Sequence, residues 1–294
     1  MAGRYPNFFI AGAAKAGTTS LFEYLRGSPG VYMCPIKEPH FFSPDAVKNP
    51  GTHQRVVDWD AYVRLFSGAT GEIAIGEASP SYLWDRQSPR LIRERLPDAK
   101  IIIVLRDPVD RAYSHYLADV RLGWQGMPFL EALQADADQA QKGWGISHLY
   151  VELGEYSEQV ARYLETFSQD AVTVLLSDDL RRDTHRCVSE VLQFLGVPEA
   201  GSLAGALPVH NVFAAPRGPW ARFAIQNATV RGLARRCVPA ALRAWIRDIV
   251  VLRRGTKPPM SSEARVFLEE YYGPDMRRLE SLLGRRLPWR WLNA

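Results

Sequence analysis

One unbroken run of large aliphatic residues, Ile101 to Leu105, limits the folds open to this chain. Such a run, without polar alternation, is typical of a strand buried on both faces of a parallel sheet. Asp107 and Pro108 follow, a helix N-cap residue and a proline suited to the first helical position. We therefore expect a helix from there to about Val120. A strand that passes directly into a helix is the repeating unit of an α/β protein.

Two more strand-to-helix units flank this one in the sequence. Phe8 to Ala11 is a short apolar run, and Thr18 to Arg26 after it has the pattern of a helix. Val172 to Leu176 repeats the buried-strand pattern, and a helix from about Thr184 to Leu195 follows and ends at Gly196. The alternation predicts a central parallel sheet flanked by helices, with ligands beyond the carboxyl ends of the strands.

The whole chain, residues 1–294, is expected to form one domain. Its 47% hydrophobic and 23% charged residues are the mixture of an ordinary globular protein. Pro44 to Trp59 has no period and is predicted to be a surface loop. Near the C-terminus, a helical stripe predicts core packing of Tyr272, Met276, Leu279 and Leu283.

A loop of small residues joins the first strand to the first helix and reads Gly12-Ala13-Ala14-Lys15-Ala16-Gly17-Thr18-Thr19-Ser20. The glycines have the separation of a nucleotide-binding P-loop, but threonine stands at position 18, where that motif requires lysine. Backbone amides at a helix start bind phosphate-like anions, and three hydroxyl side chains add donors. We expect an anion site over residues 15–20, with Lys15 above the anion. The alternative is a plain turn with Lys15 solvated.

A second anion-binding signal stands at the tip of the predicted buried strand. Arg106 follows Leu105 directly, where ligands of parallel sheets bind. Ser114 lies two helical turns beyond Asp107 on the same face, so it could share a second anion with Arg106. In the alternative interpretation, Arg106 forms a surface ion pair with Asp107 or Asp110.

Basic charge is concentrated between Arg217 and Lys257. This segment has ten Lys or Arg and the single acid Asp248, although the whole chain carries only +4. Apolar residues interleave with the charges, as in an amphipathic helix pair with a cationic face. We interpret residues 217–257 as a helical elaboration that could bring the protein to a membrane surface or hold an amphiphilic substrate there.

Other classes of protein are disfavoured. The cysteines, Cys34, Cys187 and Cys237, are odd in number and far apart, which argues against a disulfide framework or a CxxC metal site. No segment approaches the ~20 apolar residues of a membrane-spanning helix. No apolar leader is apparent at the N-terminus, so we expect a cytoplasmic protein. No nucleic-acid motif is present, and no nucleic-acid partner is expected.

The motifs together resemble the sulfotransferases that use 3′-phosphoadenosine 5′-phosphosulfate (PAPS), in particular the heparan-sulfate-type branch and its bacterial relatives. The segments that carry the likeness are Lys15 to Leu21, Arg106-Asp107-Pro108 with Ser114, Lys37-Glu38-Pro39-His40-Phe41-Phe42, Glu77-Ala78-Ser79-Pro80-Ser81-Tyr82, and Glu263 to Trp291. The resemblance implies a P-loop-like sulfotransferase fold, PAPS as co-substrate, adenosine 3′,5′-bisphosphate as product, and no metal. It also implies that residues 15–20 hold the 5′-phosphosulfate, and that Arg106 and Ser114 hold the 3′-phosphate. Arg217 is a weaker match to a third contact with that phosphate.

The resemblance also implies catalytic roles. Lys15 would stabilise charge on the departing nucleotide, and Glu38 would remove the proton from the acceptor. His40 is the rival base because its ordinary pKa is closer to neutrality. The alternative for His40 is a silent ring packed under Phe41 and Phe42.

Two departures from the heparan-modifying enzymes leave the acceptor open. Ala78 stands where they have lysine, and Ser43 where they have an acid. We expect sulfuryl transfer to a hydroxyl or amine of a carbohydrate, a lipid-linked molecule or another small molecule. Two other functions are a P-loop-type small-molecule kinase, which would require lysine at position 18 and a magnesium carboxylate, and a non-catalytic module that binds anionic surfaces through residues 217–257. The oligomeric state stays open.

Overall fold

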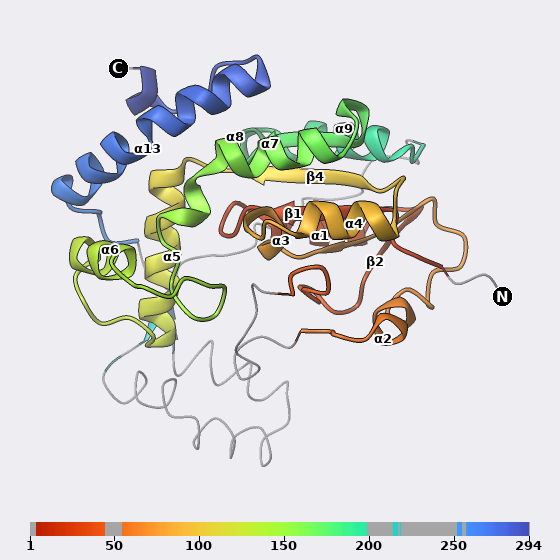
Figure 1. Cartoon of the computed structure of the whole chain (residues 1–294), viewed down its shortest axis with the longest axis horizontal. Helices are drawn as coiled ribbons and strands as arrows, with labels where there is room; N and C mark the ends of the chain where they lie inside the picture. Colours follow the sequence, from red (N-terminus) through yellow and green to blue (C-terminus); the bar gives the residue numbers. More distant parts are fainter. Residues whose placement is uncertain are drawn as a thin grey trace, which may run out of the picture.

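The computed structural model of the chain describes residues 4–44, 55–198, 214–216, 218, 252–254 and 257–293. Its centre is a five-stranded, fully parallel sheet with the strand order β2-β3-β1-β4-β5 (Figure 1). The α/β architecture predicted from the alternating pattern is therefore confirmed. The strands are β1 (Phe8–Gly12), β2 (Val31–Met33), β3 (Ala74–Ala78), β4 (Lys100–Leu105) and β5 (Val172–Leu176).

Strands β1, β3 and β4, the three inner strands, are buried because helices cover both faces of the sheet. Every residue of β1 is buried, as is every residue of β4 after Lys100. Since β1 lies between β3 and β4, the loops that follow these three strands meet at one edge of the sheet. This edge is where the sequence places its anion-binding motifs.

The helices begin and end where the sequence provides caps. The Asp107 carboxylate accepts hydrogen bonds from the amides of Val109 and Asp110 and starts α5. Gly123 ends that helix with a φ of 73°, a left-handed conformation that glycine adopts without strain. The helices are α1 (Thr18–Arg26), α2 (Trp59–Arg64), α3 (Ser81–Trp84), α4 (Ser88–Arg95), α5 (Pro108–Leu122), α6 (Phe129–Ala137), α7 (Tyr156–Thr166), α8 (Ser177–Arg182), α9 (Thr184–Leu195) and α13 (Ser262–Leu283), with the 3₁₀ turns η1 (Glu152–Gly154), η2 (Gln169–Ala171) and η4 (Arg290–Asn293).

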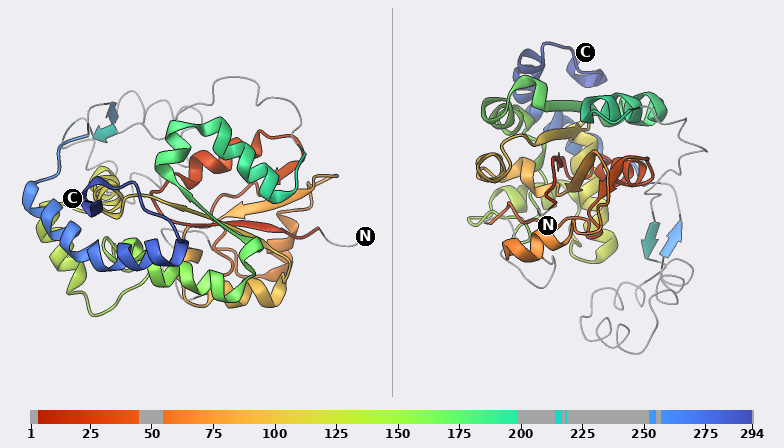
Figure 2. Two further views of the ribbon diagram at one scale, coloured as in Figure 1. Left: turned by 90° about the horizontal axis from the view of Figure 1, so that it is seen from above. Right: turned by 90° about the vertical axis from the view of Figure 1, so that its right-hand side faces the viewer.

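The helices form a layer on each side of the sheet. Figure 2 shows α1 and α9 over one face and α4 and α7 over the other. The C-terminal helix α13 packs on α7 outside this second layer. Tyr272, Met276 and Leu279 of α13 are fully buried, as their spacing predicts, and Leu283 is partly buried.

Several predictions concern residues beyond the described ones. The described residues do not include residues 45–54 of the expected loop, Cys237 or almost all of the basic segment 217–257. A second, antiparallel sheet pairs β6 (Ala214–Pro216) with β7 (Leu252–Arg254). Among the described helices, none has the length and apolar character needed to cross a bilayer. Cys34 and Cys187 are buried free thiols.

Candidate active site

The loop between β1 and α1 presents backbone amides at the carboxyl edge of the sheet. The amide of Ala13 donates to the Val104 carbonyl at 2.7 Å, which ties the loop to β4. Lys15 and Gly17 have φ angles of 65° and 105°, so the chain turns tightly into α1. Gly17 is the N-cap residue, and no side chain caps the helix. The first amides of α1 are thus available to an anion, as the sequence predicts.

Arg106 connects the two predicted anion sites. Its Nη1 donates to the Lys15 carbonyl at 3.1 Å. Its Nε is shielded from solvent and has no hydrogen-bond partner among the described residues. The acids proposed as ion-pair partners interact elsewhere: Asp107 caps α5, and Asp110 lies 3.7 Å from Arg265. The described contacts therefore favour the anion-binding interpretation of Arg106.

Ser114 lies half-buried on α5, and a fully buried arginine precedes it by one turn. Arg111 donates from Nη2 to the Tyr150 carbonyl, and its Nε and Nη1 have no hydrogen-bond partner among the described residues. Its positive charge also lowers the pKa of Lys15. Sequence analysis did not select Arg111. The last predicted nucleotide ligand, Arg217, lies outside the described residues.

Glu38 is placed at the end of β3 by its backbone. Its amide donates to the Ala78 carbonyl at 3.0 Å, and its φ of 64° turns the chain there. The carboxylate contacts the Lys37 ammonium, and its side chain keeps 30% exposure. The candidate base is therefore held at the sheet edge while still open to an acceptor.

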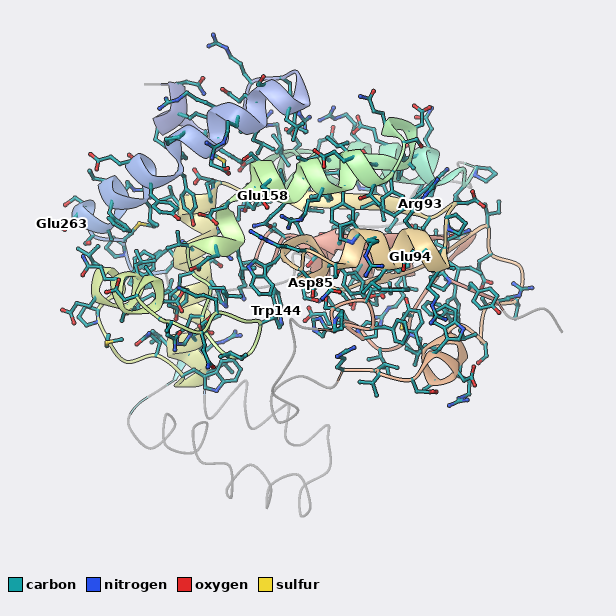
Figure 3. All side chains as sticks on the ribbon, in the orientation of Figure 1. Asp85, Arg93, Glu94, Trp144, Glu158 and Glu263 are labelled. Atoms are coloured by element: carbon teal, nitrogen blue, oxygen red, sulfur yellow. The ribbon has the colours of Figure 1, made fainter. Side chains whose placement is uncertain are left out.

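His40 is a buried neighbour of Glu38. Its Nδ1 lies 2.7 Å from the Ser81 hydroxyl, and its Nε2 lies 3.7 Å from Glu38 Oε2. The His40 ring packs near Trp144, which is labelled in Figure 3, and the centroids of the two rings are 5.8 Å apart. Phe41 and Phe42 pack on Tyr62, and the alternative of a silent His40 ring packed under them stays a prediction. This environment suits a residue that orients Glu38.

Lys15 and Glu38 belong to one electrostatic site. The Lys15 side chain is exposed, but the surrounding protein lowers its pKa, first by desolvation and then through the charge of Arg121. Asp119 and Glu38 act in the opposite direction and raise it. The charge of Glu38 thus acts on Lys15, and their joint role in one site stays a prediction.

Sequence analysis missed a second glutamate, Glu77, in the adjacent strand β3. Its carboxylate is fully buried and accepts hydrogen bonds from the hydroxyls of Tyr62 (2.8 Å), Ser79 (2.6 Å) and Tyr82 (2.6 Å). Burial is the main cause that raises its pKa to about 7, and Glu38 adds to the rise. Because Glu77 is closed off from solvent, it cannot reach an acceptor. In the sequence, only the segment Glu77-Ala78-Ser79-Pro80-Ser81-Tyr82 drew attention to it, because the strand around it was not predicted.

A further polar network lies beside Lys15 on α5. Asp119 accepts hydrogen bonds from His148 Nδ1 (2.7 Å) and the Tyr150 hydroxyl (2.9 Å). The first of these bonds raises the pKa of His148. Burial lowers the pKa of His115, one turn before Asp119, to about 3. The contacts anchor residues 148–150 next to the loop, and they join residues too distant in sequence to form a recognisable motif.

These groups can bind an anionic donor and remove a proton. Lys15, Arg106 and the α1 amides are cationic or donor groups, and Glu38 is an accessible carboxylate close by. Within the described ranges there is no group of three or more His, Cys, Asp or Glu that could hold a metal ion.

Comparison with known proteins finds a family model and solved structures that are described as sulfotransferases. A family model described as "Sulfotransferase domain" matches residues 5–221. The crystal structure of a sulfotransferase from Alicyclobacillus acidocaldarius is 32% identical, has a TM-score of 0.76, and is aligned over 98% of this chain and 99% of that one. A mouse sulfotransferase, SULT7A1, complexed with PAP, has a TM-score of 0.50 at 14% identity and shows the shared fold alone.

Curated relatives point to the same family. Human heparan sulfate glucosamine 3-O-sulfotransferase 6 is 28% identical, over 97% of this chain and 74% of its own length. Human bifunctional heparan sulfate N-deacetylase/N-sulfotransferase 3 is 27% identical, and this chain spans 31% of its length. The P-loop-like sulfotransferase fold expected from the motifs is thereby confirmed. Because the family model matches most of the sequence and the bacterial structure aligns over nearly all of it, this chain belongs to the sulfotransferase-domain family.

Proposed function

We propose that the protein transfers the sulfuryl group of PAPS to a hydroxyl or amine of a carbohydrate, lipid-linked or other small-molecule acceptor. The observation that carries the proposal is the hydrogen bond from Arg106 Nη1 to the Lys15 carbonyl, 3.1 Å long. It brings the motif for the 5′-phosphosulfate into contact with the motif for the 3′-phosphate. Two anion sites so close together suit a nucleotide that carries an anionic group at each end.

The described residues fit this co-substrate. The α1 amides and Lys15 would hold the phosphosulfate, and the shielded Nε of Arg106 is a donor that a 3′-phosphate would satisfy. Ser114 would add a hydroxyl, and Arg111 contributes positive charge from below the site. When bound, PAPS supplies an activated sulfuryl group.

The chain's own residues would carry the proton and the developing charge. The acceptor oxygen or nitrogen forms a bond to sulfur while its proton moves to the Glu38 carboxylate. The bond from sulfur to the bridging oxygen breaks, and the Lys15 ammonium stabilises the charge that this oxygen gains. His40, 3.7 Å from Glu38 Oε2, orients the carboxylate.

The relatives' names support a carbohydrate acceptor, since two of them act on heparan sulfate according to those names. The differences at Ala78 and Ser43 remain the reason not to propose heparan sulfate itself. Ser43 is buried and lies 2.9 Å from the Ser81 hydroxyl, so it supports the loop that carries His40. Membrane contact through residues 217–257 and a cytoplasmic location stay predictions.

Titration calorimetry with adenosine 3′,5′-bisphosphate and with ATP·Mg²⁺ tests the nucleotide. We expect binding of the bisphosphate without added metal. Binding of ATP·Mg²⁺ alone would instead support the small-molecule kinase.

A transfer assay with ³⁵S-labelled PAPS and pooled acceptors tests the chemistry. We expect Lys15→Ala to lower kcat by about 10²- to 10³-fold, in line with the loss of one preorganised donor. Glu38→Gln should abolish most transfer while leaving bisphosphate binding unchanged, because it changes the base and not the anion site. Full transfer activity in Glu38→Gln would show that another group is the base.

A further inference from the structure

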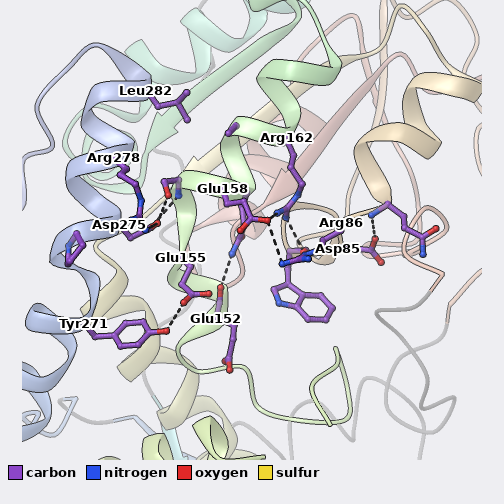
Figure 4. A pocket seen from close by; sticks show the side chains of 16 residues that line it. Asp85, Arg86, Glu152, Glu155, Glu158, Arg162, Tyr271, Asp275, Arg278 and Leu282 are labelled. Atoms are coloured by element: carbon purple, nitrogen blue, oxygen red, sulfur yellow. Dashed lines mark hydrogen bonds and ion pairs between the residues drawn. The ribbon is translucent and has the colours of Figure 1, made fainter. Parts of the chain in front are cut away.

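A large open groove lies on the face of the molecule that carries α7. It has a volume of about 1090 Å³ and runs between α13 and the turn that joins α3 to α4. In Figure 4, Tyr271 of α13 lies at one end and Asp85 and Arg86 at the other, with Glu155 and Glu158 between them. None of these residues belongs to the anion site described above.

The arginines that line this groove are all engaged by its own acids. Arg162 Nη1 lies 3.1 Å from Glu158 Oε1, and Arg86 Nη2 lies 3.6 Å from the same oxygen. Arg278 Nη2 lies 3.3 Å from Asp275 Oδ1. The charge of each guanidinium is thus partly offset by a carboxylate of the groove, while Arg86 and Arg278 keep side-chain exposures of 79% and 68%.

Carboxylates exceed arginines along the groove. The lining includes three arginines and five acids, and one of these acids, Glu152, pairs with Lys142 at 2.6 Å. The acids are Asp85, Glu152, Glu155, Glu158 and Asp275. The Tyr271 hydroxyl donates to Glu155 at 2.6 Å. Burial raises the pKa of Glu155, and the nearby charge of Glu152 raises it further. Such a surface repels anions and offers acceptors to hydroxyl and ammonium groups.

Aromatic side chains connect the groove to the reaction centre. Trp84 lines the groove and packs against a small apolar cluster that contains Ala14 and Trp144. Ala14 is the neighbour of Lys15 in the anion-binding loop, and the Trp144 ring lies 5.8 Å from that of His40. Trp84 and Trp144 thus link the wall of the groove to the segments that carry Lys15 and His40.

We propose that this groove binds the sugar chain of the acceptor, and that this chain carries hydroxyl or amino groups but no sulfate or carboxylate groups. The proposal rests on the proposed function and names its substrate class. Trp84 and Tyr271 supply aromatic surface for the apolar faces of sugar rings, and the carboxylates accept from hydroxyls and amines. The same carboxylates exclude a sulfated polymer, because like charges brought together cost binding energy.

Calorimetry on the full chain without nucleotide tests the groove with three tetrasaccharides: N-acetylglucosamine tetramer, its deacetylated form, and a heparin fragment. We expect the first two to bind in the groove, whereas any binding of the heparin fragment, for example to the basic segment 217–257, should be unchanged in variants of the groove. Trp84→Ala and Tyr271→Ala should each weaken binding by about tenfold, the effect of removing a central aromatic contact. Tyr271 is 45% exposed, so its truncation leaves the core intact. Trp124→Ala is the matched control, since Trp124 is 48% exposed and does not line the groove.

Three results would overturn the proposal: heparin binding that is weakened in both groove variants, no binding of the N-acetylglucosamine tetramer or its deacetylated form, or unchanged binding of these two in both groove variants. Adenosine 3′,5′-bisphosphate is titrated into each variant in parallel. Retained bisphosphate binding with no saccharide binding would reject the groove and leave the proposed function standing. If the wild type does not bind adenosine 3′,5′-bisphosphate, the proposed function is rejected instead.

Discussion

The buried carboxyl of Glu77 should make the stability of this protein fall as the pH rises. Burial holds its pKa at about 7, whereas an ordinary glutamate has 4.5. The protonated form is therefore favoured in the folded state. Its stabilising contribution is complete below pH 4.5 and is lost as the pH rises through 7. Glu77→Gln removes the titration while keeping the size of the side chain.

The magnitude follows from the two pKa values. Their difference corresponds to about 3 kcal/mol in the free energy of unfolding, at about 1.4 kcal/mol for each pKa unit. The glutamine can satisfy the same partners: its oxygen accepts from Tyr62 and Tyr82, which both donate to Oε1, and its amide donates to the Ser79 hydroxyl. The substitution should therefore cost little at low pH and become stabilising relative to the wild type at high pH.

Urea unfolding at a series of pH values from 4 to 8 measures the difference. The free energy of unfolding of the wild type, minus that of Glu77→Gln, should fall by about 3 kcal/mol across this range. Titrations elsewhere in the protein cancel in the subtraction. Parallel curves for the two proteins would show that Glu77 does not titrate between these limits, and would refute the reasoning from its burial.

Three further changes test contacts at and behind the site. Arg106→Lys removes the planar fork that reaches the Lys15 carbonyl and should weaken bisphosphate binding by about tenfold or more in calorimetry. Asp119→Asn removes the charged acceptor of His148 Nδ1 and should lower the pKa of His148 in an NMR titration; an unchanged pKa would contradict the assigned cause. Gly76→Ala would place a methyl group 2.4 Å from the fully buried Phe8 ring and should lower the free energy of unfolding by about 1–3 kcal/mol or more in urea unfolding, whereas Gly71→Ala, which meets nothing within 4 Å, should not.

The sequence was sufficient for the elements whose patterns are local. The aliphatic run of β4 and the cap of α5 at Asp107 depend on consecutive residues. The predicted first and last residues of β4 and of α5 lie within two residues of the observed ones. Strand β3 was not predicted because its sequence is Ala-Ile-Gly-Glu-Ala. The glycine and the glutamate interrupt the apolar run from which a buried strand is predicted. Its burial depends on β1 and β2 at its sides, which no local pattern reports.

The site was predictable to the extent that a motif carried it. Lys15, Glu38 and Arg106 were selected because they stand in short recognisable segments. The structure places Arg106 against the Lys15 carbonyl, and the roles of the three residues stay predictions. The contact between Asp119 and His148 was not predictable, because it joins α5 to a turn 29 residues later. A polar pair of this kind becomes visible only when the packing of the two segments is known.

The bond between Arg106 and the Lys15 carbonyl has a consequence for fidelity toward the donor. If Arg106 binds the 3′-phosphate of the donor, as proposed, the same guanidinium would also hold in place the loop that carries Lys15. A nucleotide analogue without the 3′-phosphate would leave Arg106 and this loop less firmly held. The protein would then discriminate between nucleotides through kcat as well as through binding affinity.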